Sequence, residues 1–476
     1  MNPYDILIIG GGHNGLVAAA TLAKAGKKVL VLEKRPILGG AWVGDGDTPA
    51  LAPFPGGALR PDITRHLGLE RIAPQPDAAK SAFVSLLPGG QSLVLDPNPA
   101  KAAESIRKFS AKDADRWTDF VTFMGKAAAF LDAAYRTIIP PLPQFDLAEG
   151  LPLAQLGLKL RGMGRKEMLN IIRALPMTAQ ELTEEWFESD MVRAAVASLG
   201  IHGVTLGVMS AGTGFNLMHN WLNRGGMAHP SLGRAPQTVN ALVSVIRAHG
   251  GEIRTQAEVT RIRVQREVVQ GVTLSSGEDI SAPVVISALD PKRTFLGLVG
   301  ATELPPTFVW QVQNIKMRGS VAKLRFTLSA SIPDRNRLPA SATWVIAPSL
   351  RYLEKAYDAA KYGEVSSQPY LEITSPAENV LDVHFQFAPY ALRQGNWNDQ
   401  RETLHHIART TLADYLPNLS ITGVESLTPL DLEQTYGLTE GDLNHGQIML
   451  DQFFFMRPIP GFADHTSPVE GLYLCG

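Results

Sequence analysis

The sequence predicts an α/β fold in which a parallel sheet is interrupted by a long, mostly helical block. An apolar strand pattern at residues 6–9 leads through a glycine-rich turn and a helix to a second apolar strand at residues 29–32. Few strand patterns occur between about residues 100 and 220, and alternating or apolar runs then return between residues 252 and 288. The parallel-sheet domain is therefore expected to be discontinuous along the chain.

The turn after the first strand has the spacing G-x-G-x-x-G, with glycines at Gly10, Gly12 and Gly15. Gly10 permits the tight turn, Gly12 lets phosphate oxygens approach the backbone, and Gly15 lets the helix pack closely on the strand. The helix at about residues 14–25 points unpaired N–H groups toward such phosphates. His13 and Asn14, inside the turn, are expected to contact the same ligand.

An acidic residue ends the second strand. Glu33 follows Gly15 by eighteen residues and can accept hydrogen bonds from ribose hydroxyls, with Lys34 beside it. Strand, glycine turn, helix, strand and acid in this order predict a dinucleotide-binding domain. The alternative is a glycine-rich turn in an unrelated α/β domain.

Composition excludes several classes of protein. The formal net charge is −2, without the basic stripe of a nucleic-acid-binding protein. The single cysteine, Cys475, cannot form an internal disulfide and fits a reducing compartment. No stretch has the length of a spanning helix, and the first apolar run is too short for a secretory signal. A cytoplasmic location, or a peripheral position on a membrane, is expected.

Further elements follow in order along the chain. Helices are expected at residues 100–109, 113–135, 238–249 and 401–416, an antiparallel meander at 252–274, a buried parallel strand at 284–288, strands of a second sheet at 321–328 and 380–387, and a last apolar strand at 471–476.

Four stretches give the chain a family resemblance. They read DILIIGGGHNGLVAAATLAKAGKKVLVLEKRPILGGAW near the start, HGGEIRTQAEVTRI and VVISALDPKRTFLGLV in the middle, and LDQFFFMRPIPGFADHTSPVEGLYLCG at the end. The chain resembles the phytoene desaturase-related FAD-dependent oxidoreductases of the amine-oxidase-like flavoprotein superfamily. Within them it resembles the branch typified by pyridine nucleotide-disulfide oxidoreductase domain-containing protein 2.

The resemblance implies a fold with a discontinuous Rossmann-like FAD-binding domain, a mixed α+β substrate domain and a helical cap insertion. The expected divisions are residues 1–75, 225–300 and 431–476 for the FAD-binding domain, 76–224 for the cap and substrate region, and 301–430 for the substrate domain. FAD is expected to contact Gly10, Gly12, His13, Asn14, Gly15, Glu33, Lys34, Gly39, Gly40, Ala41, Val259, Ala288 and Gly476.

The family has a glycine-rich motif after the last strand, whereas this sequence stops at Gly476. We therefore expect the 476-residue chain to hold FAD poorly and to lack much of the flavin absorbance.

The dinucleotide fingerprint alone fits either FAD or NAD. The Gly39-Gly40 doublet after the acid, the large insertion and the absence of a second G-x-G-x-x-G favour FAD. A redox-active C-x-x-C pair is excluded by the single cysteine.

Candidate catalytic residues are few. His445, Asp451 and Arg457 precede the last strand and could line a flavin pocket; the alternative for Asp451 and Arg457 is a structural ion pair.

Histidines near the end of the helical block are the next candidates. His202, His219 and His229 are read as ordinary polar positions, and they lack the spacing of a metal site, so no metal is expected.

A basic amphipathic stretch runs from Leu156 to Leu175. It could lie on an anionic membrane, or it could be the solvated face of a cap helix.

The expected function is FAD-dependent dehydrogenation or desaturation of a largely apolar, carotenoid- or isoprenoid-like small molecule. Hydride passes to the flavin, and an unidentified electron acceptor such as oxygen or a quinone reoxidises it. Alternatives are an amine-oxidase-like oxidase, a redox-neutral isomerase or saturase, and a flavin-binding partner protein without turnover. The oligomeric state stays open.

Overall fold

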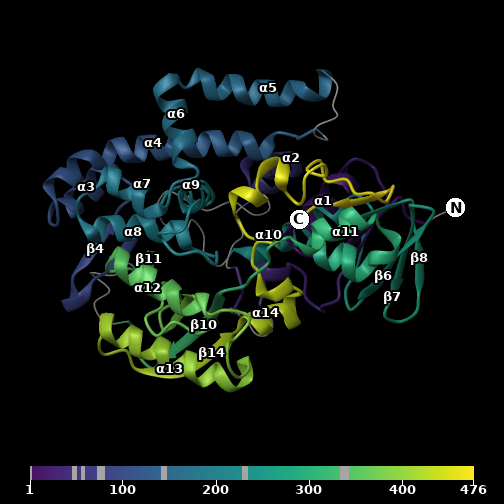
Figure 1. The fold of residues 1–476 in the computed structure, drawn as a ribbon. Coiled ribbons are helices and arrows are strands. Elements are labelled where there is room, and N and C mark those ends of the chain that lie inside the picture. Colours follow the sequence, from purple (N-terminus) through teal and green to yellow (C-terminus); the bar gives the residue numbers. More distant parts are fainter. Residues whose placement is uncertain are drawn as a thin grey trace.

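The computed structural model describes residues 3–44, 51–54, 59–71, 81–140, 147–227, 234–332 and 342–476 (Figure 1). Its first sheet has five parallel strands in the order β15-β9-β1-β2-β5. These are β1 (Ile6–Ile9), β2 (Val29–Leu32), β5 (Glu252–Arg254), β9 (Val284–Ser287) and β15 (Leu472–Leu474). The predicted α/β class with a discontinuous parallel sheet is confirmed.

Both faces of this sheet are covered. Ile6 and Ile8 point toward helices α1 (His13–Lys24) and α10 (Ala235–Ala248), and Leu7 and Ile9 point toward the opposite face. That face packs against an antiparallel meander of β6 (Val259–Gln265), β7 (Val268–Leu274) and β8 (Asp279–Ser281). A continuous apolar strand is what burial on two faces requires.

The predicted meander begins seven residues too early. Residues 252–254 leave it and pair in parallel with β2 as strand β5. Because β5 follows helix α10 directly, the chain returns to the sheet in a strand–helix–strand crossover, which produces a parallel neighbour.

A second, seven-stranded sheet has the order β14-β10-β13-β12-β11-β3-β4. Its strands are β3 (Phe83–Leu86), β4 (Ser92–Leu95), β10 (Val321–Leu328), β11 (Thr343–Ile346), β12 (Leu371–Ala377), β13 (Val380–Gln386) and β14 (Ile421–Leu427). Strands β10 and β13 confirm the two strands expected in this sheet. Strands β3 and β4 come from the block read as helical; β3 pairs in parallel with β11, more than 250 residues away.

Helices from the interrupting block pack on one side of this second sheet. They are α3 (Pro99–Arg107), α4 (Ala111–Arg136), α7 (Ala179–Trp186), α8 (Asp190–Ile201) and α9 (Thr213–Arg224), with α5 (Leu147–Gly162) and α6 (Arg165–Ala174) outside them. Trp117 and Phe120 of α4 form the centre of their core, and the Phe120 and Phe187 rings lie 5.0 Å apart.

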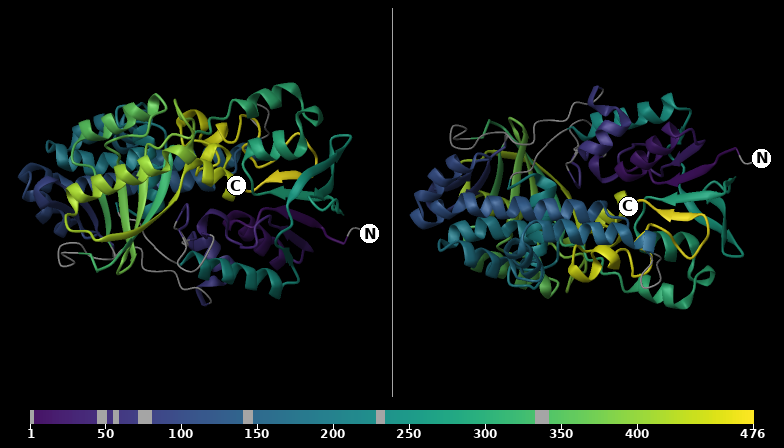
Figure 2. Two further views of the ribbon diagram at one scale, coloured as in Figure 1. Left: turned by 90° about the horizontal axis from the view of Figure 1, so that it is seen from below. Right: turned by 90° about the horizontal axis from the view of Figure 1, so that it is seen from above.

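The remaining helices are α2 (Pro61–Leu67), α11 (Pro306–Gln313), α12 (Leu350–Lys361), α13 (Trp397–Tyr415) and α14 (Pro429–Tyr436). Within the described ranges, none of the helices combines the length and apolar character needed to cross a bilayer. Figure 2 shows the first and second sheets as two bodies side by side, with the last strand returning to the first.

Candidate functional site

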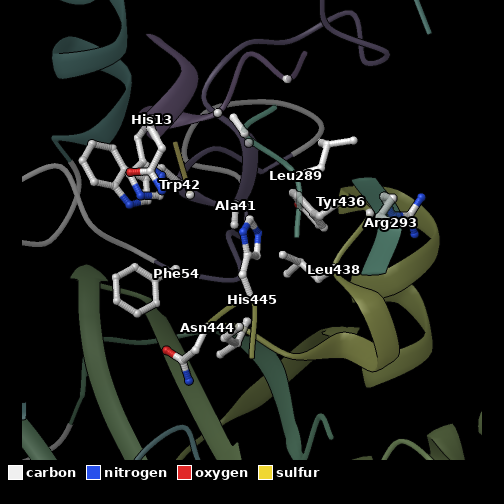
Figure 3. Close-up of a pocket in the computed structure, with 18 of the residues that line it drawn as sticks. His13, Ala41, Trp42, Phe54, Leu289, Arg293, Tyr436, Leu438, Asn444 and His445 are labelled. Carbon is white, nitrogen blue, oxygen red and sulfur yellow. The ribbon is translucent and has the colours of Figure 1, made fainter. Parts of the chain in front are cut away.

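A cavity of about 760 Å³ lies between the two sheets (Figure 3). We call one side the nucleotide wall; it consists of Gly10, residues 12–14, Glu33 and residues 40–42. We call the other the side-chain wall; it consists of His202, His219, Arg224, Asn444 and His445. The cavity thus joins the carboxyl end of the parallel sheet, where α/β folds bind ligands, to side chains of the second half of the molecule.

The nucleotide wall is shaped by close contacts between glycines. Gly10 has a φ of +99°, and a Cβ on Gly15 would lie 2.1 Å from the Gly10 carbonyl oxygen. Gly40 has a φ of +56°, and a Cβ there would lie 2.9 Å from the Cα of Gly12. The Gly39-Gly40 doublet therefore packs directly on the glycine turn, and only glycines allow the two backbones to approach this closely.

Glu33 holds this turn in place. Its carboxylate is 6% exposed and accepts from the Gly11 amide at 2.7 Å and from the Arg35 amide at 2.8 Å. Each carboxylate oxygen retains acceptor capacity for a ribose hydroxyl. Helix α1 begins beside it without a side-chain cap and without an acid in its first turn, so its first amides can bind an anion.

Two histidines face the middle of the cavity. The His13 ring stacks on Trp42 with centroids 4.3 Å apart and planes 1° apart. Burial, with His445 nearby, lowers the pKa of His13 to about 4. Burial also lowers the pKa of His445, whose ring points into the cavity in Figure 3. Neutral imidazoles at these positions can donate or accept a hydrogen bond without adding charge.

Most of the residues that the sequence predicted to contact FAD line this one cavity. They are Gly10, Gly12, His13, Asn14, Glu33, Lys34, Gly40, Ala41, Val259, Ala288 and Gly476. Gly15 and Gly39 lie behind the surface and set its shape. Strands that are distant in sequence thus place their ends around one space.

The three candidate catalytic residues do not lie together in the structure. His445 and Arg457 line the cavity, whereas Asp451 is half exposed and pairs with Lys316. Arg457 is buried and donates to the carbonyl oxygens of Asn444 and Gly446. Asp451 and Arg457 therefore do not form the ion pair considered from the sequence.

Two of the three histidines read as ordinary polar positions also lie in the cavity wall. The Tyr135 hydroxyl and the Asn223 side chain hold the His219 ring at 2.5 Å and 2.8 Å, and burial lowers the pKa of His219 to about 4. His202 lines the cavity as well, whereas His229 lies outside the described residues. No group of side chains suited to a metal ion occurs in the described part of the chain.

A buried charged cluster lies behind the side-chain wall. Arg224 donates to both oxygens of Glu372, at 2.9 and 3.2 Å. The His202 Nδ1 is 3.5 Å from the same carboxylate, and the His202 ring stacks on His384 at 4.1 Å. Lys323 contacts His384 Nδ1 at 2.9 Å, and burial lowers the pKa of Lys323 to about 8. The alternation of polar and apolar residues along β10, β12 and β13 could have indicated that polar side chains share one face of the sheet. It could not have shown that one of them, Glu372, pairs with Arg224 of α9.

A smaller cavity of about 200 Å³ adjoins the first. Tyr135, Ile139, Phe453 and Phe454 give it an apolar lining. The two cavities share Leu289, His445, Arg457 and Gly476. Sequence reasoning missed Trp42, Phe54, Arg293, Tyr436, Leu438 and Asn444, which come from loops and helix ends without a pattern of their own.

Comparison with known proteins agrees with this arrangement. Residues 8–49 match the family described as NAD(P)-binding Rossmann-like domain. The chain is 29% identical to pyridine nucleotide-disulfide oxidoreductase domain-containing protein 2 of Rattus norvegicus, covering 99% of this chain and 89% of the relative. It is 24% identical to one of the limonene dehydrogenase chains of Castellaniella defragrans, covering 99% of this chain and 90% of that one.

The chain is an oxidoreductase with an amine-oxidase-like fold. The solved structure of cyclohexylamine oxidase from Brevibacterium oxydans aligns with a TM-score of 0.53 at 16% identity, covering 99% of this chain and 92% of that one. This similarity concerns the fold. The resemblance inferred from the four sequence stretches is thereby confirmed, and it extends over the whole chain.

Proposed function

We propose that the chain is an FAD-dependent dehydrogenase that removes a hydride and a proton from a largely apolar small molecule. The observation that carries this proposal is the continuity of the 760 Å³ cavity from the glycine turn to the side-chain wall. A dinucleotide held at one wall and a substrate held at the other would meet within one cavity, as flavin chemistry requires.

The residues at the nucleotide wall fit FAD. The uncapped start of α1 suits the pyrophosphate, and Glu33 suits the adenosine ribose. Arg293 lines the cavity, and its Nε is buried without a hydrogen-bond partner among the described residues. Basic residues outnumber acidic ones in the lining, which favours a ligand with two phosphates. Bound FAD would supply the hydride acceptor.

The side-chain wall contains a group that could accept the proton removed from the substrate. His202 faces the cavity, and the Glu372 carboxylate, held by Arg224, lies against its Nδ1 side. A carboxylate in this position stabilises a protonated imidazole and favours proton transfer to Nε2. Phe54, Leu438 and Leu443 provide apolar contact beside it. The similarity to the limonene dehydrogenase chain also supports an apolar substrate.

An amine-oxidase-like activity is the alternative within the same fold. The lining contains Lys34, Arg35, Arg224, Arg293 and Arg457 but only Glu33 and Glu258 as acids. The two phosphates of bound FAD and the Glu372 partner of Arg224 would offset this positive charge, so the apolar side chains of the lining, such as Phe54 and Leu438, decide between the two substrate classes. We therefore favour a neutral substrate.

The test is anaerobic titration of the FAD-loaded protein with two probes, limonene and cyclohexylamine. Bleaching of the flavin band by limonene, slower in His202→Gln, supports the proposal. Bleaching by cyclohexylamine alone supports the oxidase alternative. Conversion without net bleaching indicates an isomerase, and no reaction with either probe or with related hydrocarbons favours a binding protein without turnover.

A further inference from the structure

The buried charged cluster behind the side-chain wall is arranged as two rows across the second sheet. In the first row, Lys323 of β10 lies opposite His384 of β13, which lies opposite Glu372 of β12. In the second row, Arg325 of β10 lies opposite Asp382 of β13. Residues two apart on a strand share a face, so both rows lie on one side of the sheet. All members are buried except Asp382, whose side chain is 16% exposed and brings the cluster to the solvent.

The two carboxylates of the cluster have cationic partners. Glu372 accepts from two nitrogens of Arg224 and from the Tyr370 hydroxyl. Asp382 accepts two hydrogen bonds of 2.6 Å from Arg325. Both carboxylates are therefore held as ion pairs with arginines, and the remaining groups that can exchange a proton are basic.

The first of these basic groups, His384, is fixed as a neutral spacer by Gln386. The Gln386 side-chain oxygen accepts from the Gly203 amide at 2.9 Å, and its nitrogen donates to the Val204 carbonyl oxygen at 2.6 Å. In this orientation His384 Nε2 donates to Gln386 Oε1, so Nδ1 is the acceptor for Lys323 at 2.9 Å. Burial, with Lys323 nearby, holds the pKa of His384 well below its usual value. His384 therefore does not take up a second proton.

The other two basic groups, His202 and Lys323, both contact this spacer. The His202 ring stacks on the His384 ring with centroids 4.1 Å apart, and Lys323 Nζ lies at Nδ1 of the same ring. Two positive charges at such a short range repel each other strongly where little water screens them. A proton on one of the two groups therefore disfavours a proton on the other.

Lys323 has both a weakly held proton and a route for it. Burial lowers the pKa of Lys323 to about 8; the carboxylates of Glu372 and Asp382 oppose this shift. Arg224 of α9 adds to it. A cavity of about 30 Å³, large enough for a water molecule, is lined by Lys323, His202 and Asp382. Water in this cavity would connect the ammonium to the partly exposed carboxylate.

We propose that Lys323 exchanges protons in step with His202, so that at neutral pH the two groups hold one mobile proton between them. When His202 Nε2 takes the proton from the substrate C–H bond, one N–H bond of the Lys323 ammonium breaks and its proton passes to water in the small cavity. The charge of the cluster stays constant, and the step needs no oxidant beyond the hydride acceptor. Lys323 does not touch the substrate and acts through His202. The origin of the proton rests on the function proposed above, whereas the coupling of the two groups exists without turnover.

The first experiment follows the His202 imidazole by NMR in the 476-residue chain with isotope-labelled histidine. The His202 signal is the one that is missing from His202→Gln. We expect a second, smaller step in its chemical shift near pH 8, where Lys323 loses its proton. Lys323→Met should abolish this step and raise the pKa of His202 by about one unit or more, because a buried positive charge is removed.

Lys323→Arg separates the effect of charge from that of shape. Arginine stays protonated throughout the titration, so the pKa of His202 should match that of the unchanged protein while the step near pH 8 disappears. Lys101→Met, which removes an exposed charge from α3, should change neither feature. An equal pKa of His202 in the unchanged protein and in Lys323→Met overturns the proposal. Absence of the step from the unchanged protein also overturns it, without any variant having to fold.

The second experiment measures the rate of anaerobic flavin bleaching by limonene as a function of pH. In the unchanged protein the rate should rise several-fold through pH 8, because His202 becomes a stronger base when Lys323 is neutral. Around pH 8 the rate should be high and flat in Lys323→Met, and low and flat in Lys323→Arg. The same profile in all three proteins overturns the exchange. No bleaching in any of them, with the NMR coupling intact, overturns only the function proposed above.

Discussion

The nucleotide wall of the cavity is made of backbone, whereas the side-chain wall is made of charged groups from distant segments. Along the nucleotide wall, Gly10, Gly12 and Gly40 bring main chains together, with Gly15 packed behind them, and one acid holds the turn. Behind the side-chain wall, Arg224 of α9 pairs with Glu372 of β12, and His202, which follows α8, stacks on His384 of β13. The first wall should be sensitive to added volume, and the second to lost charge.

Removing one partner of the buried ion pair should have the largest effect. Arg224→Met leaves the Glu372 carboxylate buried without its cation, which should lower the free energy of unfolding by about 4 kcal/mol. Urea unfolding measures the change. Arg173→Met, which breaks the exposed pair with Glu185, should cost less than about 1 kcal/mol. Equal losses would show that burial of the charges does not matter here.

The Lys323 ammonium should make stability depend on pH. Burial lowers its pKa to about 8 from 10.5, so the unfolded chain binds more protons than the folded one between these values. Its contribution is least favourable below pH 8 and rises by about 3 kcal/mol as the pH increases through this window. The unfolding free energy of the unchanged protein, measured relative to that of Lys323→Met, should therefore increase from pH 8 to 10.5. Exposed Lys101→Met should give a flat difference.

Adding a methyl group to the glycine turn tests whether the nucleotide wall is sensitive to added volume. Gly15→Ala places a Cβ 2.1 Å from the Gly10 oxygen, so the turn must open, at a cost of about 2 kcal/mol. FAD binding should weaken at the same time, which fluorescence titration would detect. Gly125→Ala in α4 meets nothing within 4 Å and should stabilise the protein by about 1 kcal/mol. A neutral Gly15→Ala would remove the distinction between the two walls.

The acid of the nucleotide wall should have the smallest effect on the fold and a clear one on the ligand. Glu33→Gln keeps one acceptor for the backbone but loses the charge, so affinity for FAD should fall by about tenfold. Glu258, an exposed acid on the rim of the same cavity, provides the control, and Glu258→Gln should leave affinity unchanged. The same affinity in both variants would argue against a ribose contact at Glu33.

The contrast between the walls also explains what could be predicted from the sequence. The glycine spacing and Glu33 identify the nucleotide wall because strand, turn and helix are contiguous there. His202, Glu372 and Lys323 lie on three elements up to 170 residues apart, and only the tertiary fold brings them together. Strand β3 escaped prediction for the same reason, because its pairing with β11 depends on contacts far along the chain, and β4 joins the sheet only through β3.

Assembly of the parallel sheet has a consequence for biosynthesis. Its strand order collects segments from residue 6 to residue 474, and β9, which pairs with β1, follows it by nearly 280 residues. Strands β1 and β2 can pair early, but the other edge of β1 and one face of this unit stay uncovered until β9 and the later strands have been made. Chains with such distant pairings fold slowly and aggregate easily in the interval. Chaperones that shield these apolar surfaces during translation should therefore raise the yield of native protein.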